Sequence, residues 1–276
     1  MKTTYLKWTT LGVGALALGS LTACDQTENL ELSDSTENAS LEAAAETGGL
    51  RQGESGEGGE SGEGGIDAQR AATDAVVAVA EAHIRAAKDA YAAGEKDAAT
   101  EMFGHPVSEV LAEMEDVLAA QGVGDLTQMF LDASDAAYQG VSAEDLEARA
   151  TAMIAALANA GTKAPNDGRS DGVIAVSVVA DQIERAANMY QEAKSSDRYE
   201  PYLDGYGFYK TAAAADAANR TVITDDAEAL VDTVESALSL LEEAYPQAGP
   251  RGPLDKNPAQ LTAASSKLQL ALTSLE

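Results

Sequence analysis

The chain has 276 residues and a formal net charge of −28, from 46 acidic and 18 basic side chains. A surface this acidic argues against a nucleic-acid-binding function, because such proteins need a basic footprint. Since there is one cysteine, no disulfide bond can form within the chain, and the fold must be held by packing.

The N-terminus has the layout of a secretory signal, predicted to cover residues 1–23. Lys2 and Lys7 precede an apolar run from Leu11 to Leu18 that is too short to span a bilayer, and "LTAC" follows at 21–24. These four residues resemble the lipobox of bacterial lipoproteins. The resemblance implies cleavage before Cys24 and attachment of a diacylglycerol, with palmitate-type acyl chains, to its thiol. The alternative is an ordinary cleaved signal followed by a free thiol.

An acidic linker is predicted after the cleavage site, so that residues 24–65 comprise the lipidated cysteine and this linker. Residues 25–65 hold eleven acidic side chains and one basic one, Arg51, and end in two copies of "ESGEGG". A segment of glycine, glutamate and serine without aromatic residues cannot bury enough apolar surface to fold, which predicts disorder. It is not a phosphate-binding loop, because no Gly-Lys-Ser/Thr follows.

Residues 66–276 are predicted to form one all-α domain. Their 35 acidic and 15 basic side chains give a surface that favours cations. Apolar residues recur with the 3.6-residue period of a helix, as in Ala227, Leu230, Val231, Val234, Leu238, Leu241 and Tyr245. The one strand-like run, "GVIAVSVV" at 172–179, continues into such a stripe. We therefore expect an antiparallel bundle of about eight helices.

Glycine and proline predict where these helices end. Breaks are expected at Gly94, 104–106, 122–124, Gly140, 161–168 and 246–253. Helix starts are predicted after Ser142, which precedes "AED", and after Thr224, which precedes "DDAE". The first three helices would then cover 66–93, 95–103 and 106–120.

The stretch "FGHPVSEV" at 103–110 contains one of the two histidines. Pro106 suits the first position of a new helix, and Glu109 would lie in its first turn, where a carboxylate interacts favourably with the helix dipole. This structural interpretation leaves His105 unexplained. By the 100° step, Glu109 lies nearly opposite the apolar stripe of helix 106–120, so we expect it to face solvent or a cleft against another element.

Spacing also allows a metal site made of His83, His105 and Glu109. His105 and Glu109 are four residues apart and share a helix face. His83 lies eleven residues before Gly94 and His105 eleven after it, so an antiparallel hairpin would bring the two histidines to the same level. Two imidazoles and a carboxylate suit zinc or ferrous iron. The alternative for His83 is a core histidine, because it borders the apolar stripe of its own helix.

The stretch "YEPYLDGYGFYK" at 199–210 carries four tyrosines at helical spacing. Together with two neighbouring acidic residues, these tyrosines would form an alternative metal site, whose oxygen ligands suit ferric iron or calcium. The residues of this alternative site are Tyr199, Glu200, Tyr202, Asp204, Tyr206 and Tyr209. The structural alternative places the rings in the core and the hydroxyls at a wet seam. Gly205 and Gly207 each cost a helix about 1 kcal/mol, which predicts a bent or exposed segment.

Two family resemblances follow from these motifs. The Gly104-His105 pair with Glu109, in an alanine-rich, lipid-anchored helical chain, resembles imelysin-type periplasmic proteins, whose pattern is Gly-x-His-x-x-Glu; here Glu109 is one residue further on. The stretch "YEPYLDGYGFYKTA" is similar to helical periplasmic segments attached to high-affinity iron permeases. Both resemblances imply an all-α protein involved in iron uptake. No HExxH motif or catalytic triad is present, so no peptidase activity is expected.

We therefore expect a non-enzymatic lipoprotein of the cell envelope that faces the periplasm from the inner or outer membrane. It would bind a metal cation, iron or zinc, for uptake or homeostasis. Its partners would be the membrane, through its lipid, and a permease or other envelope protein, but no nucleic acid. The alternative is an interaction protein whose bundle docks a protein partner.

Overall fold

The computed structural model describes residues 66–120, 122–196, 198–249 and 252–275, without the side chains of 66–69 and 113. The predicted signal peptide, Cys24 and linker lie outside the described residues. Within the described residues there are eight α-helices, one π-helical turn and no strand, which confirms the predicted all-α fold. None of these helices is both long and apolar enough to cross a membrane.

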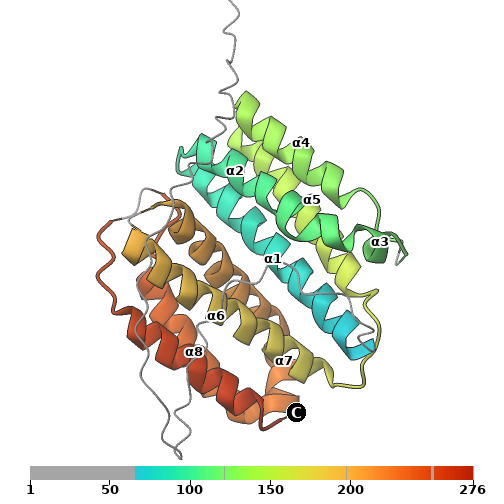
Figure 1. Ribbon diagram of the computed structural model, residues 1–276, viewed down its shortest axis with the longest axis vertical. Coiled ribbons are helices and arrows are strands. Elements are labelled where there is room, and N and C mark those ends of the chain that lie inside the picture. The colour runs from blue at the N-terminus through green and yellow to red at the C-terminus, as the bar shows by residue number, and fades with distance from the viewer. Residues whose placement is uncertain (1–65, 121, 197, 250–251, 276) are drawn as a thin grey trace, which may run out of the picture. The chain divides into compact units, whose positions relative to one another are not determined.

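The central helix is α1 (Ile66–Ala92), and the first helix group forms around it. It packs on α2 (Lys96–Pro106) and α5 (Ala143–Gly161), and α4 (Leu126–Gln139) lies against both of these, which closes a group of four helices (Figure 1). Gly94 turns the chain after α1 with φ of 93°, a left-handed conformation that glycine adopts without steric cost. Ser142 caps α5 as predicted, because its hydroxyl accepts a hydrogen bond from the Asp145 N–H at 3.1 Å.

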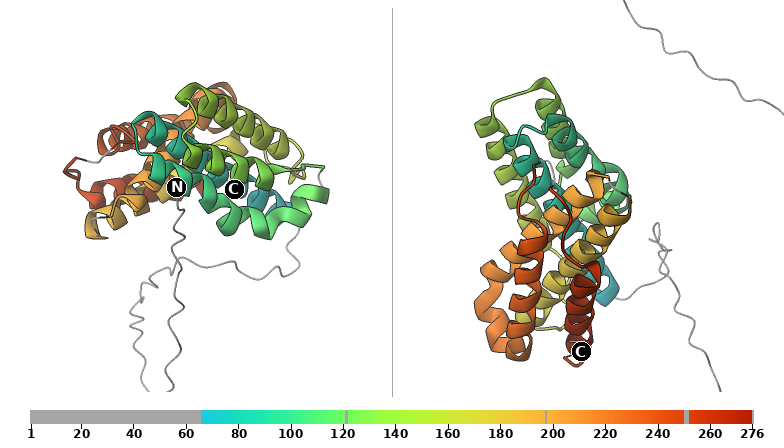
Figure 2. Two further views of the ribbon diagram at one scale, coloured as in Figure 1. Left: turned by 90° about the horizontal axis from the view of Figure 1, so that it is seen from above. Right: turned by 90° about the vertical axis from the view of Figure 1, so that its left-hand side faces the viewer.

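The second helix group contains α6 (Asp171–Ser196), α7 (Glu200–Ala244) and α8 (Pro258–Leu272). These three helices pack on one another, and α6 and α7 also contact α1, so α1 belongs to the core of both groups (Figures 1 and 2). Thr224 does not cap a helix start as predicted, because its hydroxyl donates to the Arg220 carbonyl inside α7, although two helical segments do join three residues further on. The helix instead kinks at Ala227, where φ is −141° and ψ is 38°.

The predicted break at 104–106, with a helix start at Pro106, is also wrong. Helix α2 continues through Gly104 and ends at Pro106, the π-helical turn η1 (Val107–Leu111) follows directly, and α3 (Ala112–Ala120) continues from it. Proline has no N–H to donate within an α-helix, and here the following turn widens to the π pattern while the chain stays helical. Pro106 and Leu111 are buried, so packing holds this segment in place.

Gly205 and Gly207 do not mark a bent or exposed segment, contrary to the expectation from their helix propensity. Both are buried within the straight first part of α7. A Cβ atom at Gly205 would overlap the Tyr245 hydroxyl, and one at Gly207 would overlap the Ala82 carbonyl oxygen of α1. The two glycines are therefore required for close packing, and the one at 207 lets α7 cross the backbone of α1.

Candidate metal centre

Three side chains from three helices meet where α7 crosses α1. His83 on α1, His105 on α2 and Asp204 on α7 each offer one ligand atom, and these atoms lie within 4.8 Å of one another. The two imidazole rings have a centroid distance of 5.7 Å, because the turn at Gly94 brings α2 back along α1. The structure thus joins the two histidines of one predicted site to Asp204 of the other.

The ring of His83 is fixed in one tautomer. Its Nδ1 lies 2.8 Å from the Val79 carbonyl oxygen, which can only accept, so Nδ1 carries the proton and Nε2 keeps its lone pair. Burial lowers the pKa of His83, which is 4% exposed, and this favours the neutral form. A neutral imidazole whose second nitrogen is held by a carbonyl is the form that ligates metals.

Two buried polar atoms of the cluster have no hydrogen-bond partner among the residues that the structure describes. These are His105 Nδ1 and Asp204 Oδ1. Leaving a buried polar group unpaired costs about 1–3 kcal/mol. Asp204 Oδ1 lies 3.6 Å from the Nε2 atom of His83, which is too long for a good hydrogen bond. The cluster therefore holds buried polar atoms that no atom of the described protein satisfies, and a cation bound among the three side chains would satisfy them.

The carboxyl group of Asp204 is strongly perturbed. Burial, followed by the negative charges of Glu109, Glu200 and Glu192, raises its pKa to about 8, and Arg198 offsets only part of this. In the cation-free protein the group therefore holds a proton at neutral pH. A divalent cation would reverse this, because an adjacent positive charge favours the carboxylate.

Two further carboxylates lie at the rim. Glu109, in the π-helical turn, has its Oε2 3.5 Å from His83 Nε2 and its Oε1 3.9 Å from His105 Nδ1. Its side chain is 51% exposed and lies beside α1, in agreement with the expected position against another element. Glu200 has its Oε1 3.9 Å from His105 Nε2, and it also pairs with Arg198 at 3.4 Å.

The four tyrosines of the predicted alternative site do not converge on a common point. Tyr199 donates to the Ala248 carbonyl, Tyr202 donates to a neighbouring carbonyl in the loop after α7, and Tyr206 donates to an Asp89 carboxylate oxygen at 2.8 Å. Tyr209 stacks on another tyrosine ring at a centroid distance of 6.4 Å. Burial raises the pKa of Tyr199 to about 12 and that of Tyr206 further, so these hydroxyls stay protonated. The rings pack against the core as in the structural alternative, but the hydroxyls of Tyr199, Tyr202 and Tyr206 bond to protein groups and not to a wet seam.

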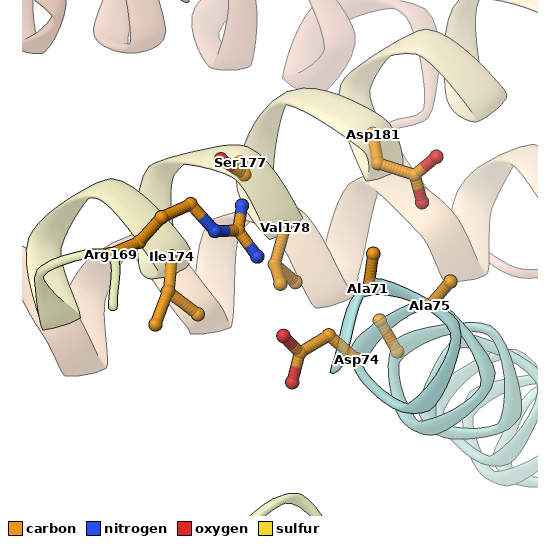
Figure 3. Close-up of a pocket in the computed structure, with 9 residues that line it drawn as sticks. Ala71, Asp74, Ala75, Arg169, Ile174, Ser177, Val178 and Asp181 are labelled. Atoms are coloured by element: carbon orange, nitrogen blue, oxygen red, sulfur yellow. The ribbon is translucent and has the colours of Figure 1, made fainter. Parts of the chain in front are cut away.

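A pocket of about 250 Å³ lies elsewhere, between α1 and α6 (Figure 3). Alanine, isoleucine and valine side chains form its apolar wall. Its charged groups already have partners in the protein, in the pairs Asp74–Arg70, Asp181–Arg185 and Arg169–Asp167. The pocket contains neither histidine, and its paired charges indicate no particular ligand.

Comparison of the chain with protein-family models, curated proteins and solved structures finds no match. The resemblances to imelysin-type proteins and to iron-permease segments therefore remain expectations.

Proposed function

We propose that this chain is a non-enzymatic lipoprotein of the cell envelope that binds a divalent transition-metal cation, iron or zinc, for uptake or homeostasis. The observation that supports it most is the cluster of His83, His105 and Asp204, whose ligand atoms lie within 4.8 Å of one another. Among the described residues, His105 Nδ1 and Asp204 Oδ1 are buried and have no hydrogen-bond partner. Nitrogen and carboxylate donors together suit zinc and ferrous iron. The lipid anchor rests on the sequence around Cys24 alone.

The charges around the cluster favour a cation. The negative charges of Glu109, Glu200 and Glu192 act on Asp204, while two basic side chains oppose a cation, Arg198 at Asp204 and Arg185 at His83. With both histidines neutral, the carboxylates of Asp204 and Glu109 would together balance the charge of a divalent ion. The acidic composition of the whole chain would add attraction at longer range.

Calorimetry on the full chain tests the proposal, with ferrous iron, zinc, manganese and cobalt as titrants. We expect binding of at least one ion, together with a rise in melting temperature, because a ligand at 100 times its Kd stabilises the native state by about 2.7 kcal/mol. His83→Ala, His105→Ala and Asp204→Asn should each remove the binding. Tyr206→Phe should retain it, because its hydroxyl is bonded to Asp89.

Absence of binding for all four ions would refute the metal proposal. Loss of binding in Tyr206→Phe, with the histidine variants unaffected, would move the site to the tyrosines. In the first case the alternative function, docking of a protein partner by the helical domain, would become the proposal to test.

A further inference from the structure

Resting on the proposed function, we infer that Glu109 is the fourth ligand of a closed, four-coordinate site, which favours zinc over six-coordinate ferrous or manganous ions. The donor set would be the imidazoles of His83 and His105 and the carboxylates of Asp204 and Glu109. This deepens the proposed function, because it names the class of cation that the cluster selects.

The distances between donor atoms support a tetrahedral arrangement. Bond lengths of about 2.0–2.2 Å in a tetrahedron put ligand atoms about 3.3–3.6 Å apart. An octahedron with similar bond lengths puts neighbouring ligand atoms only about 2.8–3.1 Å apart. His83 Nε2 lies 3.5 Å from Glu109 Oε2 and 3.6 Å from Asp204 Oδ1, which matches the tetrahedral spacing. His105 Nδ1 lies 3.9 Å from Glu109 Oε1, and the ligand atoms of the two histidines and Asp204 are within 4.8 Å of one another, so the His105 ring would have to move closer when the ion binds.

The π-helical turn explains how Glu109 takes part. A π turn contains one more residue than an α turn, and such turns occur frequently at functional sites. In the turn Val107–Leu111, Leu111 lies in the core and is 1% exposed, while the carboxylate oxygens of Glu109 lie within 4 Å of both histidine rings. A carboxylate on the polar side of this helix can thereby reach a cluster at the core boundary.

The outer contacts complete the argument for four ligands. His83 Nδ1 donates to the Val79 carbonyl, which is the kind of second-nitrogen partner that fixes the ring of a ligating histidine. His105 Nε2 lies 3.9 Å from the Glu200 carboxylate, beyond hydrogen-bond distance, while Nδ1 of the same ring is the nitrogen near Glu109. Glu200 is thus assigned to the outer side of His105 and does not ligate the cation. The cation then has four donors, from His83, His105, Asp204 and Glu109.

Cobalt(II) in place of the native ion provides the test, because four-coordinate cobalt absorbs visible light far more strongly than six-coordinate cobalt. We expect the full-length protein with cobalt to give the intense four-coordinate spectrum, and zinc to displace cobalt. Zinc should bind at least about tenfold more tightly than ferrous iron or manganese in calorimetry.

Glu109→Gln should lose the intense bands and bind zinc at least about tenfold more weakly, in line with the loss of one ligand. Glu115→Gln is the matched control, because it removes an equal charge from an exposed position on α3 and should change neither readout. Circular dichroism would check that both variants fold.

The outcomes separate this inference from the proposed function. A weak, six-coordinate cobalt spectrum in the unmodified protein, or an unchanged zinc affinity in Glu109→Gln, would overturn the four-coordinate site while metal binding stands. Absence of binding for cobalt, zinc, iron and manganese would overturn both.

Discussion

Replacing Asp204 with asparagine should stabilise the cation-free protein while it removes cation binding. The reason is that Asp204 is an acid buried among other acids. Its pKa is raised from 3.8 in the unfolded chain to about 8 in the folded protein, mainly by burial and by the charge of Glu109. Ionising this group in the folded state therefore opposes folding, and asparagine has no such charge.

The sign of the pH dependence follows from the direction of this shift. Between about pH 4 and pH 8 the folded state retains a proton on Asp204 that the unfolded state has lost, so stability falls as the pH rises through this window. One pKa unit corresponds to about 1.4 kcal/mol, so the shift from 3.8 to about 8 sets an upper limit of about 6 kcal/mol above pH 8. Since asparagine leaves polar atoms of its own to satisfy, we expect a net gain of about 1–3 kcal/mol there.

Urea denaturation in the presence of a chelator measures this effect. The free energy of unfolding of Asp204→Asn should exceed that of the unmodified protein by more at about pH 8.5 than at about pH 5. Burial lowers the pKa of His83, so the folded state loses stability as the pH falls below 6.5, the value in the unfolded chain. This loss is common to both proteins. Asp225→Asn, at an exposed position on the same helix, is the control. A difference that does not grow with pH, or a less stable Asp204→Asn at the higher pH, would refute the reasoning.

Three further variants test other parts of the structure. Gly207→Ala should lower the free energy of unfolding by about 1–3 kcal/mol, because the added Cβ atom would overlap the backbone of α1. Gly104→Ala has open space around its Cβ atom and should raise the free energy of unfolding by up to about 1 kcal/mol. Similar urea midpoints for the two variants would contradict the close helix crossing. Tyr206→Phe should cost about 1 kcal/mol through its lost hydrogen bond to Asp89, and a larger loss in the same assay would show that the hydroxyl does more than this. Cys24→Ser should abolish fatty-acid labelling and membrane fractionation, and retained labelling would disprove the lipid anchor.

Local sequence signals predicted most of the fold because they act within one helix. The helical periodicity, the Ser142 cap and the turn at Gly94 each depend on neighbours in the chain, and the structure confirms them. The predictions failed where packing decided between two local possibilities. Pro106 is compatible with a helix start, yet it lies buried at the end of α2, and Thr224 is a good cap residue that lies inside α7.

The candidate site was predictable only in the part that the hairpin brings together. His83 and His105 lie on consecutive helices, so their approach followed from the turn between them. Asp204 reaches them through the crossing of α7 over α1, and contacts between these helices join residues as far apart as Asp89 and Tyr206, which are 117 positions apart. No local pattern identifies which helix lies across α7. The glycine at 207 in a helix interior indicates only that another backbone can approach closely at this position.

The position of the cluster has a mechanical consequence for a chain with one cysteine. His83 lies on α1, which both helix groups share, His105 lies on α2 of the first group, and Asp204 lies on α7 of the second. A cation bound to all three would tie distant points of the chain together, as a disulfide bond does when it restricts the unfolded ensemble. This tie would be reversible without any redox reaction, because removing the ion releases it. Helix α7 would then separate from α1 and α2 more readily under force or protease attack whenever the surrounding cation concentration is low.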